Sequence, residues 1–582
     1  MAASESRTLA NLLATRDDAS LATLLSARGV SPRASWSDAF DAAEDLLDNS
    51  SIARALADLT ADEVDALVAA GPDGAVPAGD ARDELIVRAL ADDAGRPWRV
   101  VAEMVATGGG AGTATSASAP ASEPLDDPRA EATGAAEAER AFAAVGSVAD
   151  ILHAALAAPL ARIGAGTLGA TDRRRLIETG AVTDASAAED LVAIAERAGL
   201  LAPEDRSFLV TEAGLTWLGS STLVRWSDVA QRLLAALPRG VQGGVRGGGG
   251  WRPVADWPRA YPFDATWPLR ATSLAALLRR WALVDAAGAP APWMRAAAVG
   301  GTVDLDILAG LLPPEVDRVY LQNDLTAIAP GSLAPHLDMR LRTMARRESR
   351  AQASTYRFTA ETLADALTAG ETASSLREFL LALSLTGLPQ PLAYEIERTA
   401  SRHGTLRVGP DSSGRTRVSS SDDALLRTIA VDQALRPLGL VADGADLVTR
   451  SSPDTAFWMI ADARYPVVAV DADGGRRAHD RHRLASSPAP AADPVAIYAD
   501  LIARLRAADQ GDADAAWLGR ELEQSVRARA TLIVTVRLPD GSERDFTIEA
   551  TGLGGGRLRG LDRTVDVERT LPVSSIVRVR PA

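Results

Sequence analysis

The chain has 582 residues, with 61 basic and 77 acidic side chains, no Cys and no Lys, so every basic residue is Arg. Without Lys it cannot build the phosphate-binding Lys of a P-loop, the strand Lys of a kinase or a Schiff-base amine. Without Cys it cannot form disulfides, thiolate zinc sites or iron–sulfur clusters. The compositional explanation for the missing Lys is a chain rich in Ala, Arg, Asp and Gly, as expected of a GC-rich genome.

Size and charge set the expected organisation. At about 150 residues per domain, three or four domains are expected. No stretch approaches the roughly 18 apolar residues of a membrane helix, and Met1–Ala10 lacks a signal-peptide pattern, so we expect a soluble cytoplasmic protein. Of the net charge of −16, residues 1–150 carry −15, with 11 Arg against 26 Asp and Glu. This block is unsuited to phosphate contact, whereas the later domains are near neutral.

The N-terminal quarter predicts helices and then a linker. Residues 1–106 predict an acidic domain of short amphipathic helices, in which Thr60-Ala-Asp-Glu63 has the form of a capping box. Residues 107–144 begin with a stretch of Gly, Ala, Ser, Thr and Pro that has no periodicity. They predict a flexible linker.

Residues 145–300 predict a winged helix followed by a Trp-rich helical region. Two helices, at 168–176 and 186–201, precede a short strand at 207–211, which is the order of a winged helix-turn-helix. Seven of the eleven Trp lie between Trp217 and Trp293, where the intervening helices are typical of packing elements.

Residues 301–473 predict an α+β domain. We expect a strand over 319–329, a helix over 333–348 and a strand over 355–358, then three helices and four strand-like pieces between 360 and 470. After a polar linker at 474–493, residues 494–582 predict helices followed by five short strands in a small β-barrel or sandwich. The fold class is therefore α+β multidomain, with a mostly helical N-terminal half.

Several motifs in 317–408 match a known family in order. They are Val319-Tyr-Leu-Gln-Asn-Asp-Leu-Thr-Ala-Ile-Ala-Pro-Gly331, the helix Leu341–Ala345, Ala353-Ser-Thr-Tyr-Arg357, Leu388-Pro-Gln-Pro-Leu392 and Arg402-His-Gly-Thr-Leu-Arg-Val408. This segment resembles the helicase-associated domain related to the N-terminal domain of XPB-type DNA helicases. The whole layout resembles actinobacterial helicase-associated domain-containing proteins.

The C-terminal segment 530–581 is similar to a WYL module. The similarity is carried by Leu538-Pro-Asp-Gly541, Gly556-Arg-Leu-Arg-Gly-Leu561 and Arg569-Thr-Leu-Pro-Val573. The usual Trp-Tyr-Leu triad is absent, and Val536 stands where the family strand has an aromatic residue. Both departures weaken the case for ligand sensing by this module.

The resemblance implies a role in DNA metabolism, such as repair or transcription, but no motor, because the chain contains no Walker A, DEAD/DEAH box or helicase motif pair. We expect a non-enzymatic accessory protein without catalytic residues, cofactor or metal site. Its partners would be DNA, single-stranded or forked DNA included, and/or helicase or transcription machinery, with no membrane contact. The alternative is a protein-interaction scaffold or ligand-responsive transcriptional regulator without direct DNA contact, and the oligomeric state stays open.

The densest basic cluster falls inside the resembling segment and comprises Arg340, Arg342, Arg346, Arg347, Arg350 and Arg357. On the predicted helix, positions 342, 346 and 350 share one face, which would suit bidentate phosphate contacts. Tyr356 could stack on an unpaired base. The alternatives are a solvated face with intrahelical ion pairs and a half-buried strand aromatic.

The winged helix carries weaker signals. At the position of the recognition helix, Ala187–Ala198 presents three acids against a lone Arg197, which does not suit a major-groove reader. We expect a packing or protein-contact module, with Arg173, Arg174 and Arg175 of the preceding helix as candidates for contact with the DNA backbone. Gln322, Asn323 and Asp324 favour a turn over a nucleic-acid contact. The five His show no metal-ligand spacing.

Overall fold

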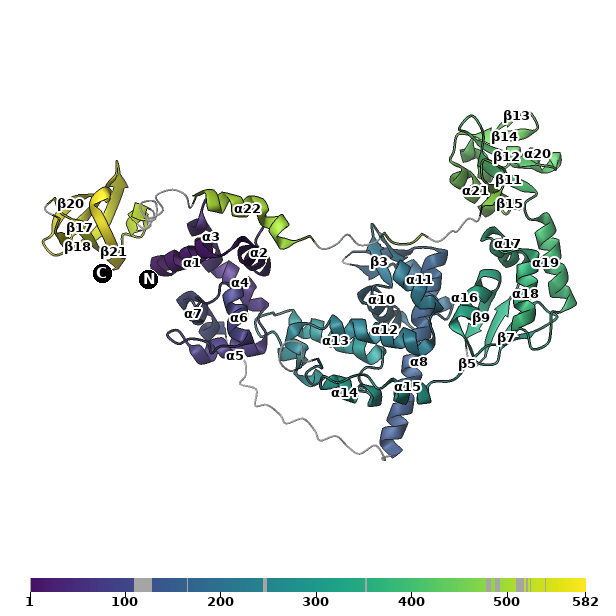
Figure 1. Cartoon of the computed structure of the whole chain (residues 1–582), viewed down its shortest axis with the longest axis horizontal. Helices are drawn as coiled ribbons and strands as arrows, with labels where there is room; N and C mark the ends of the chain where they lie inside the picture. The colour runs from purple at the N-terminus through teal and green to yellow at the C-terminus, as the bar shows by residue number, and fades with distance from the viewer. Residues whose placement is uncertain are drawn as a thin grey trace.

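The computed structural model describes residues 2–108, 128–164, 166–243, 249–350, 353–477, 483–486, 492–508, 518–519, 522–523, 525–539 and 541–581. They form an α+β protein, about half helical, with several sheets. Five separate hydrophobic cores divide these residues into five units. Figure 1 shows the units along an elongated molecule, from the yellow C-terminal strands on the left, past the purple N-terminal helices, to the green units on the right. The predicted fold class is confirmed.

The N-terminal helical unit is built from seven short helices. Asp17, Asp38 and Asp48 accept backbone N–H bonds at three of the helix starts, and the predicted capping box of Thr60 and Glu63 is present. The helices are α1 (Ala2–Thr15), α2 (Asp18–Ala27), α3 (Ala39–Leu47), α4 (Asn49–Ala57), α5 (Ala61–Ala70), α6 (Asp80–Val87) and α7 (Arg99–Gly108).

A helix from the far end of the chain completes this unit. Helix α22 (Pro494–Ala508) lies against α2, and its buried Tyr498, Leu501, Ile502 and Leu505 belong to the same core as the N-terminal helices. The Tyr498 hydroxyl donates to the Val30 carbonyl at 2.7 Å. Figure 1 shows α22 beside α2 and α3, far from the segments that precede it. The polar linker that precedes α22 therefore returns the chain to its beginning.

This docking gives a testable prediction. Leu501→Ala should destabilise the N-terminal helical unit by about 2 to 5 kcal/mol, because it leaves a cavity at a fully buried position. Hydrogen exchange of α1 to α4 would report the change. Ile497→Ala, on the same helix but 43% exposed, is the matched control and should have little effect. Equal protection of α2 in the two variants would contradict the docking.

The second unit is the winged-helix unit. It contains α8 (Pro128–Ala157), β1 (Leu160–Ile163), β2 (Thr167–Leu168), α9 (Ala170–Glu178), α10 (Ala185–Arg197), β3 (Leu201–Glu204), β4 (Ser207–Val210), α11 (Glu212–Gly219), α12 (Thr222–Ala235), α13 (Trp267–Arg280), α14 (Arg295–Ala298) and α15 (Leu305–Leu311). Strand order β2-β1-β4-β3, with β3 and β4 as an antiparallel wing after α9 and α10, matches the predicted winged-helix order.

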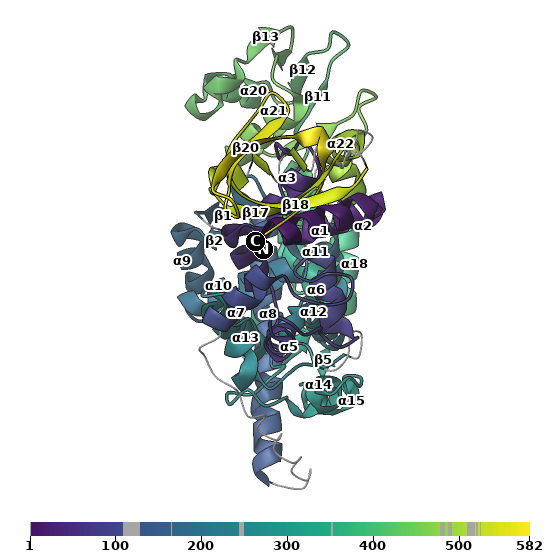
Figure 2. The ribbon, with the colours of Figure 1, turned by 90° about the vertical axis from the view of Figure 1, so that its left-hand side faces the viewer.

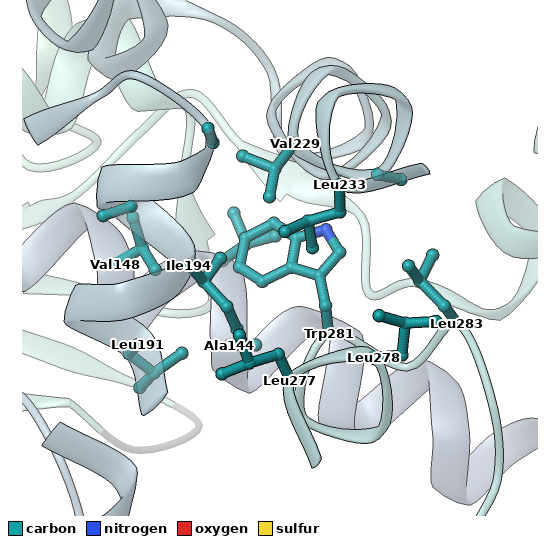
Figure 3. Packing of buried hydrophobic residues seen from close by; sticks show 14 of the residues in the cluster. Ala144, Val148, Leu191, Ile194, Val229, Leu233, Leu277, Leu278, Trp281 and Leu283 are labelled. Atoms are coloured by element: carbon teal, nitrogen blue, oxygen red, sulfur yellow. The ribbon is translucent and has the colours of Figure 1, made fainter. Parts of the chain in front are cut away.

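The Trp-rich helices form the centre of this unit's core. Trp226 on α12 and Trp281 after α13 exchange two hydrogen bonds, each indole Nε1 donating to the other's carbonyl at 2.9 and 3.0 Å. Figure 3 shows the Trp281 ring enclosed by aliphatic side chains of α8, α10, α12 and α13, Ile194 among them. The predicted packing role of the Trp residues is confirmed.

Helix α8 corrects one expectation. Within it, Gly134–Ala157 is long and apolar enough to cross a membrane by length and composition, contrary to the prediction that no stretch approaches this size. More than half of its most apolar window is buried inside the protein. Val148, Ile151 and Leu152 belong to the core of the winged-helix unit, which accounts for the hydrophobicity of the helix. Figure 2 shows α8 running lengthwise through that unit.

The predicted α+β domain at 301–473 contains two cores. The first α+β unit comprises β5 (Glu315–Val316), β6 (Tyr320–Leu321), β7 (Thr326–Ala329), β8 (Ser332–Leu333), α16 (Pro335–Met344), β9 (Arg346–Arg350), β10 (Ser354–Arg357), α17 (Ala360–Thr368), α18 (Ala373–Leu383) and α19 (Gln390–Arg402). Its main sheet has the order β6-β7-β10-β9.

Two predicted elements of this unit are wrong in extent. The single strand over 319–329 is the hairpin of β6 and β7, because Gln322, Asn323 and Asp324 form the turn that their polar side chains favour. The Thr326 hydroxyl lies 2.5 Å from Asp324 Oδ1 and closes this turn. The helix predicted over 333–348 ends at Met344, since Ala345 is extended and the next five residues pair with β10.

The second α+β unit comprises β11 (Leu406–Pro410), β12 (Thr416–Ser420), α20 (Asp423–Val431), β13 (Val441–Asp443), β14 (Asp446–Thr449), α21 (Pro453–Asp462), β15 (Val467–Val470) and β16 (Arg476–Arg477). Its six strands have the order β13-β14-β12-β11-β15-β16. Within the predicted polar linker that follows, residues 483–486 lie along the wing of the winged-helix unit, where the Ala485 N–H donates to the Val210 carbonyl at 2.8 Å. His479 and His482 lie outside the described residues.

The C-terminal unit confirms the five predicted strands. They are β17 (Thr531–Arg537), β18 (Glu543–Gly554), β19 (Arg557–Asp562), β20 (Val567–Pro572) and β21 (Ile576–Pro581). All pair antiparallel in the order β20-β19-β18-β17-β21. The two end strands do not pair with each other, so the sheet is open rather than the closed barrel that was one of the expectations.

Candidate nucleic-acid interface

The predicted Arg stripe does not exist as one helical face. Arg340 and Arg342 lie on α16, whereas Arg346, Arg347 and Arg350 lie on strand β9. The break at Ala345, which is 1% exposed, turns the chain back along β10. The stripe prediction fails because strand pairing between β9 and β10 overrides the helical spacing of the sequence.

Two of these arginines bind an acid of the winged-helix unit. Asp150 on α8 accepts from Arg342 at 2.8 Å and from Arg347, and its side chain is only 5% exposed. Arg342 also bonds Asp338, one turn earlier on α16, at 2.8 Å. The Tyr356 hydroxyl donates to the other oxygen of Asp338. We call Asp150, Asp338, Arg342, Arg347 and Tyr356 the ionic junction; it joins the winged-helix unit to the first α+β unit.

The charges of the ionic junction stabilise one another. Burial works to raise the pKa of Asp338, but Arg342, the Tyr356 hydroxyl and Arg347 outweigh it and hold that pKa below its usual range. Burial and the Asp338 carboxylate raise the pKa of Tyr356, so its hydroxyl stays protonated and remains a donor. Two acids and two guanidiniums balance, as buried charges require.

His153, one turn after Asp150 on α8, is held neutral beside this junction. Burial lowers the pKa of His153 to about 3, and the Arg342 charge acts in the same direction. The pKa of an unfolded-state His is about 6.5. Below that pH the unfolded chain takes up a proton that the folded protein does not, so stability falls as the pH drops from about 6.5 toward 3.

His153→Gln should therefore flatten the pH dependence of stability. Between about pH 6.5 and 4.5 the wild type should lose up to about 1.4 kcal/mol per pH unit through this residue. Thermal unfolding of the variant across this window is the measurement, with exposed His336→Gln as the control. An unchanged slope in His153→Gln would show that His153 is protonated in the folded protein.

A cavity of about 620 Å³ opens beside the ionic junction. Asp150 of α8, Arg225 of α12 and Arg342 of α16 line it, together with Tyr356. The charged side chains of the junction that line it are engaged with one another, and the Arg225 Nε donates to the Trp217 carbonyl at 3.0 Å. The junction therefore acts first as a contact between units.

Arg340, Arg346 and Arg357 lie nearer the surface. Arg340 forms an ion pair with Glu371 at 3.0 Å and stands over the Phe379 ring, 4.4 Å from its centroid. Arg357 pairs with Glu348. Arg346 is exposed, and Arg350 ends β9. Tyr356 is 1% exposed, so it cannot stack on a base in this conformation. The structure thus separates the cluster into a buried junction and a paired or exposed rim.

Helix α10, which occupies the position of a recognition helix, is packed against the rest of the unit rather than exposed to DNA. Every residue of α10 from Ala187 to Glu196 is buried or half-buried, because α13 packs along it. Two of its three acids form ion pairs, Glu189 with Arg173 at 2.8 Å and Asp190 with Arg280 at 3.0 Å. These contacts support the expected packing role of this module.

The three predicted arginines of α9 differ in exposure. Arg173 is tied to α10 through Glu189, and Arg175 pairs with Asp172 at 2.9 Å on its own helix. Arg174 is exposed.

Among the described residues no group of three His, Asp or Glu side chains could hold a metal ion.

The principal residue missed from the sequence is Asp150. It lies 192 positions before Arg342 in the chain, and nothing in the local pattern of α8 marks it. A charged residue on an otherwise apolar helix face is the one available signal, since such a charge must find a partner when it is buried.

Comparison with family models matches residues 319–443 to the helicase conserved C-terminal domain. The match covers most of the first α+β unit and continues to the end of β13 in the second. A search of curated proteins finds no match to the chain. Residues 319–443 are therefore a helicase-associated domain, and the chain has a helicase-related role in nucleic-acid metabolism.

Proposed function

We propose that this protein is a non-motor accessory factor of DNA metabolism, acting in repair or transcription by binding DNA and/or a helicase. One observation carries the proposal: a helicase-associated domain at 319–443 lies in a chain that contains no Lys. A P-loop motor needs a Lys on the nucleotide phosphates, so the described domain would serve another motor or act alone. The resemblance to XPB-type and WYL modules also supports a role in DNA metabolism.

The geometry supports a rigid adaptor. The ionic junction fixes the helicase-associated domain to the winged-helix unit, and the winged helix itself is used for packing. Nucleic-acid contact then falls to exposed arginines, of which Arg174 and Arg346 belong to the predicted set. Exposed guanidiniums bind phosphates without sequence preference, which suits a factor that recognises DNA structure.

The test is equilibrium binding of the full chain to single-stranded, duplex and forked DNA at low salt, together with nucleotide turnover with and without DNA. We expect binding to at least one DNA and no turnover. Absence of binding to all three would contradict the DNA-contact form of the proposal. Turnover that survives rigorous purification would contradict the non-motor form.

A protein-interaction scaffold is the second candidate, favoured by one surface of the helicase-associated domain. Tyr320, Leu381, Leu385 and Tyr394 are 44%, 59%, 51% and 67% exposed. Ser384 forms an isolated β-bridge with Val319, which brings Leu385 close to Tyr320. The ion pair between Arg377 and Glu397 joins α18 to α19 nearby. Aromatic and aliphatic side chains at this exposure are typical of protein contacts. A helicase that binds wild type but not Tyr394→Ala would support this candidate.

A further inference from the structure

The six-stranded sheet of the second α+β unit has one face under α20 and α21 and a second face, called the open face below, that these two helices do not cover. Leu406, Val408, Val418 and Val467 point to the core under α20 and α21. Because strand side chains alternate, Arg407, Arg417 and Val468 point to the other face. Val448 and Val468 are buried yet lie outside that core, which agrees with this assignment.

Two arginines meet on the open face. In the register of the sheet, Arg407 on β11 lies beside Val468 on β15, and Arg476 on β16 lies beside Val470. A Cβ placed on Gly404 would come within 3.0 Å of the Arg476 Nη2 and 3.5 Å of Val468 Cγ1. The Arg476 guanidinium therefore lies near Val468, and Arg407 is the register neighbour of Val468 on β11. Arg477 points the opposite way, toward Asp454 of α21 at 3.5 Å.

The arginine charges of the open face are paired with carboxylates at one end of the sheet. Near β13 and β14, Arg417 pairs with Asp446 at 3.0 Å, and Arg415 with Asp443 at 2.8 Å. At the β11–β16 end, Arg407 and Arg476 are exposed, and neither forms an ion pair with any carboxylate in the described part of the chain. Among the described residues, this end of the sheet therefore carries two exposed arginines without a carboxylate partner.

A buried histidine adjoins this end of the sheet. His403, at the end of α19, is 6% exposed, and its Nε2 has no hydrogen-bond partner among the described residues. Burial lowers the pKa of His403 to about 4, and the positive charge of Arg476 adds to the effect. His403 is therefore neutral at pH 7 and adds no positive charge to this end of the sheet.

We propose that the open face of this sheet binds the phosphate backbone of a nucleic acid through Arg407 and Arg476. A guanidinium pair on a flat sheet suits successive phosphates, because each fork can donate two hydrogen bonds to one phosphate. The uncompensated charge favours a polyanion over a protein surface. This inference rests on the proposed DNA-binding function.

The test compares double variants of the full chain. Arg407→Ala with Arg476→Ala should lower affinity for single-stranded or duplex DNA about tenfold or more and reduce the salt slope of duplex binding by about 2. The matched control is Arg427→Ala with Arg436→Ala, which removes the same charge from exposed positions in and after α20. Arg407→Lys with Arg476→Lys should keep the slope near the wild-type value.

The outcomes separate the inference from the function it rests on. If the wild type binds DNA and the alanine pair at 407 and 476 binds like the control pair, this face is not the contact surface, although the function stands. If the wild type binds no DNA, this result contradicts both the inference about the sheet and the proposed DNA-binding function. Selective loss of affinity and slope at 407 and 476 supports both.

Discussion

Replacing Asp150 with Ala is expected to destabilise the contact between the winged-helix unit and the helicase-associated domain by about 3 to 5 kcal/mol. Asp150 is the shared acceptor of Arg342 and Arg347, whose side chains are 14% and 16% exposed. Its removal leaves two guanidiniums buried with Asp338 as the remaining acid of the junction. Hydrogen exchange of α8 and α16 would show the loss as faster local opening.

The control removes an exposed ion pair of the same kind. Glu397→Ala breaks the pair with Arg377, in which both side chains are more than half exposed, and should cost at most about 1 kcal/mol. Adding Arg347→Met to Asp150→Ala should recover part of the loss, since the second change removes an unpaired charge. If Asp150→Ala behaves like Glu397→Ala, the junction does not hold the two units together.

Trp281→Ala is expected to lower the stability of the winged-helix unit by about 3 to 5 kcal/mol. The indole is fully buried, and its loss leaves a cavity between α8, α10, α12 and α13, as Figure 3 shows. It also removes the donor to the Trp226 carbonyl. Thermal unfolding and the near-ultraviolet signal of the Trp residues are the measurements.

Two further variants divide this effect into its causes. Trp281→Phe keeps an aromatic ring but loses the Nε1 hydrogen bond to the Trp226 carbonyl, so the loss of that bond should cost about 0.5 to 1.5 kcal/mol. Leu269→Ala on α13, at a position that is 77% exposed, should change stability by no more than about 0.5 kcal/mol. If Trp281→Ala matched Leu269→Ala, the Trp-rich helices would not form the core.

Local signals were sufficient for elements that local chemistry decides. Helix α17 begins at Ala360 as predicted, because Thr359 caps it through the N–H of Thr362. The wing of β3 and β4 follows α10 as predicted, since Gly199 adopts a positive φ of 67° after the helix. The five C-terminal strands alternate and turn where their sequence indicates.

Distant contacts account for what the sequence did not reveal. Spacing put Arg342 and Arg346 on one helix, but β9 pairs with β10, and the ion pair of Arg342 is with Asp150 in another unit. Helix α22 completes a core whose other helices lie more than 380 residues earlier. Periodicity reports which face of an element is apolar, and the partner of that face depends on tertiary structure.

A cluster of arginines in the sequence does not by itself mark a phosphate-binding surface in this protein. Of the six arginines that are densest in sequence, four (Arg340, Arg342, Arg347 and Arg357) form ion pairs with Asp150, Asp338, Glu371 and Glu348. Arg407 and Arg476, which lie 69 positions apart in the sequence, lie on neighbouring strands of one sheet region without a carboxylate partner in the described residues. Uncompensated charge, rather than density along the chain, is the better guide to a phosphate contact.

The most direct test of the central claim is the salt dependence of DNA binding by the full chain, measured from about 50 to 200 mM salt on duplex DNA. Contact with two or three phosphates predicts that the logarithm of the binding constant falls with the logarithm of salt concentration at a slope of about −2 to −3. Affinity that does not change with salt, or no binding at the lowest salt, would contradict a nucleic-acid-binding accessory protein.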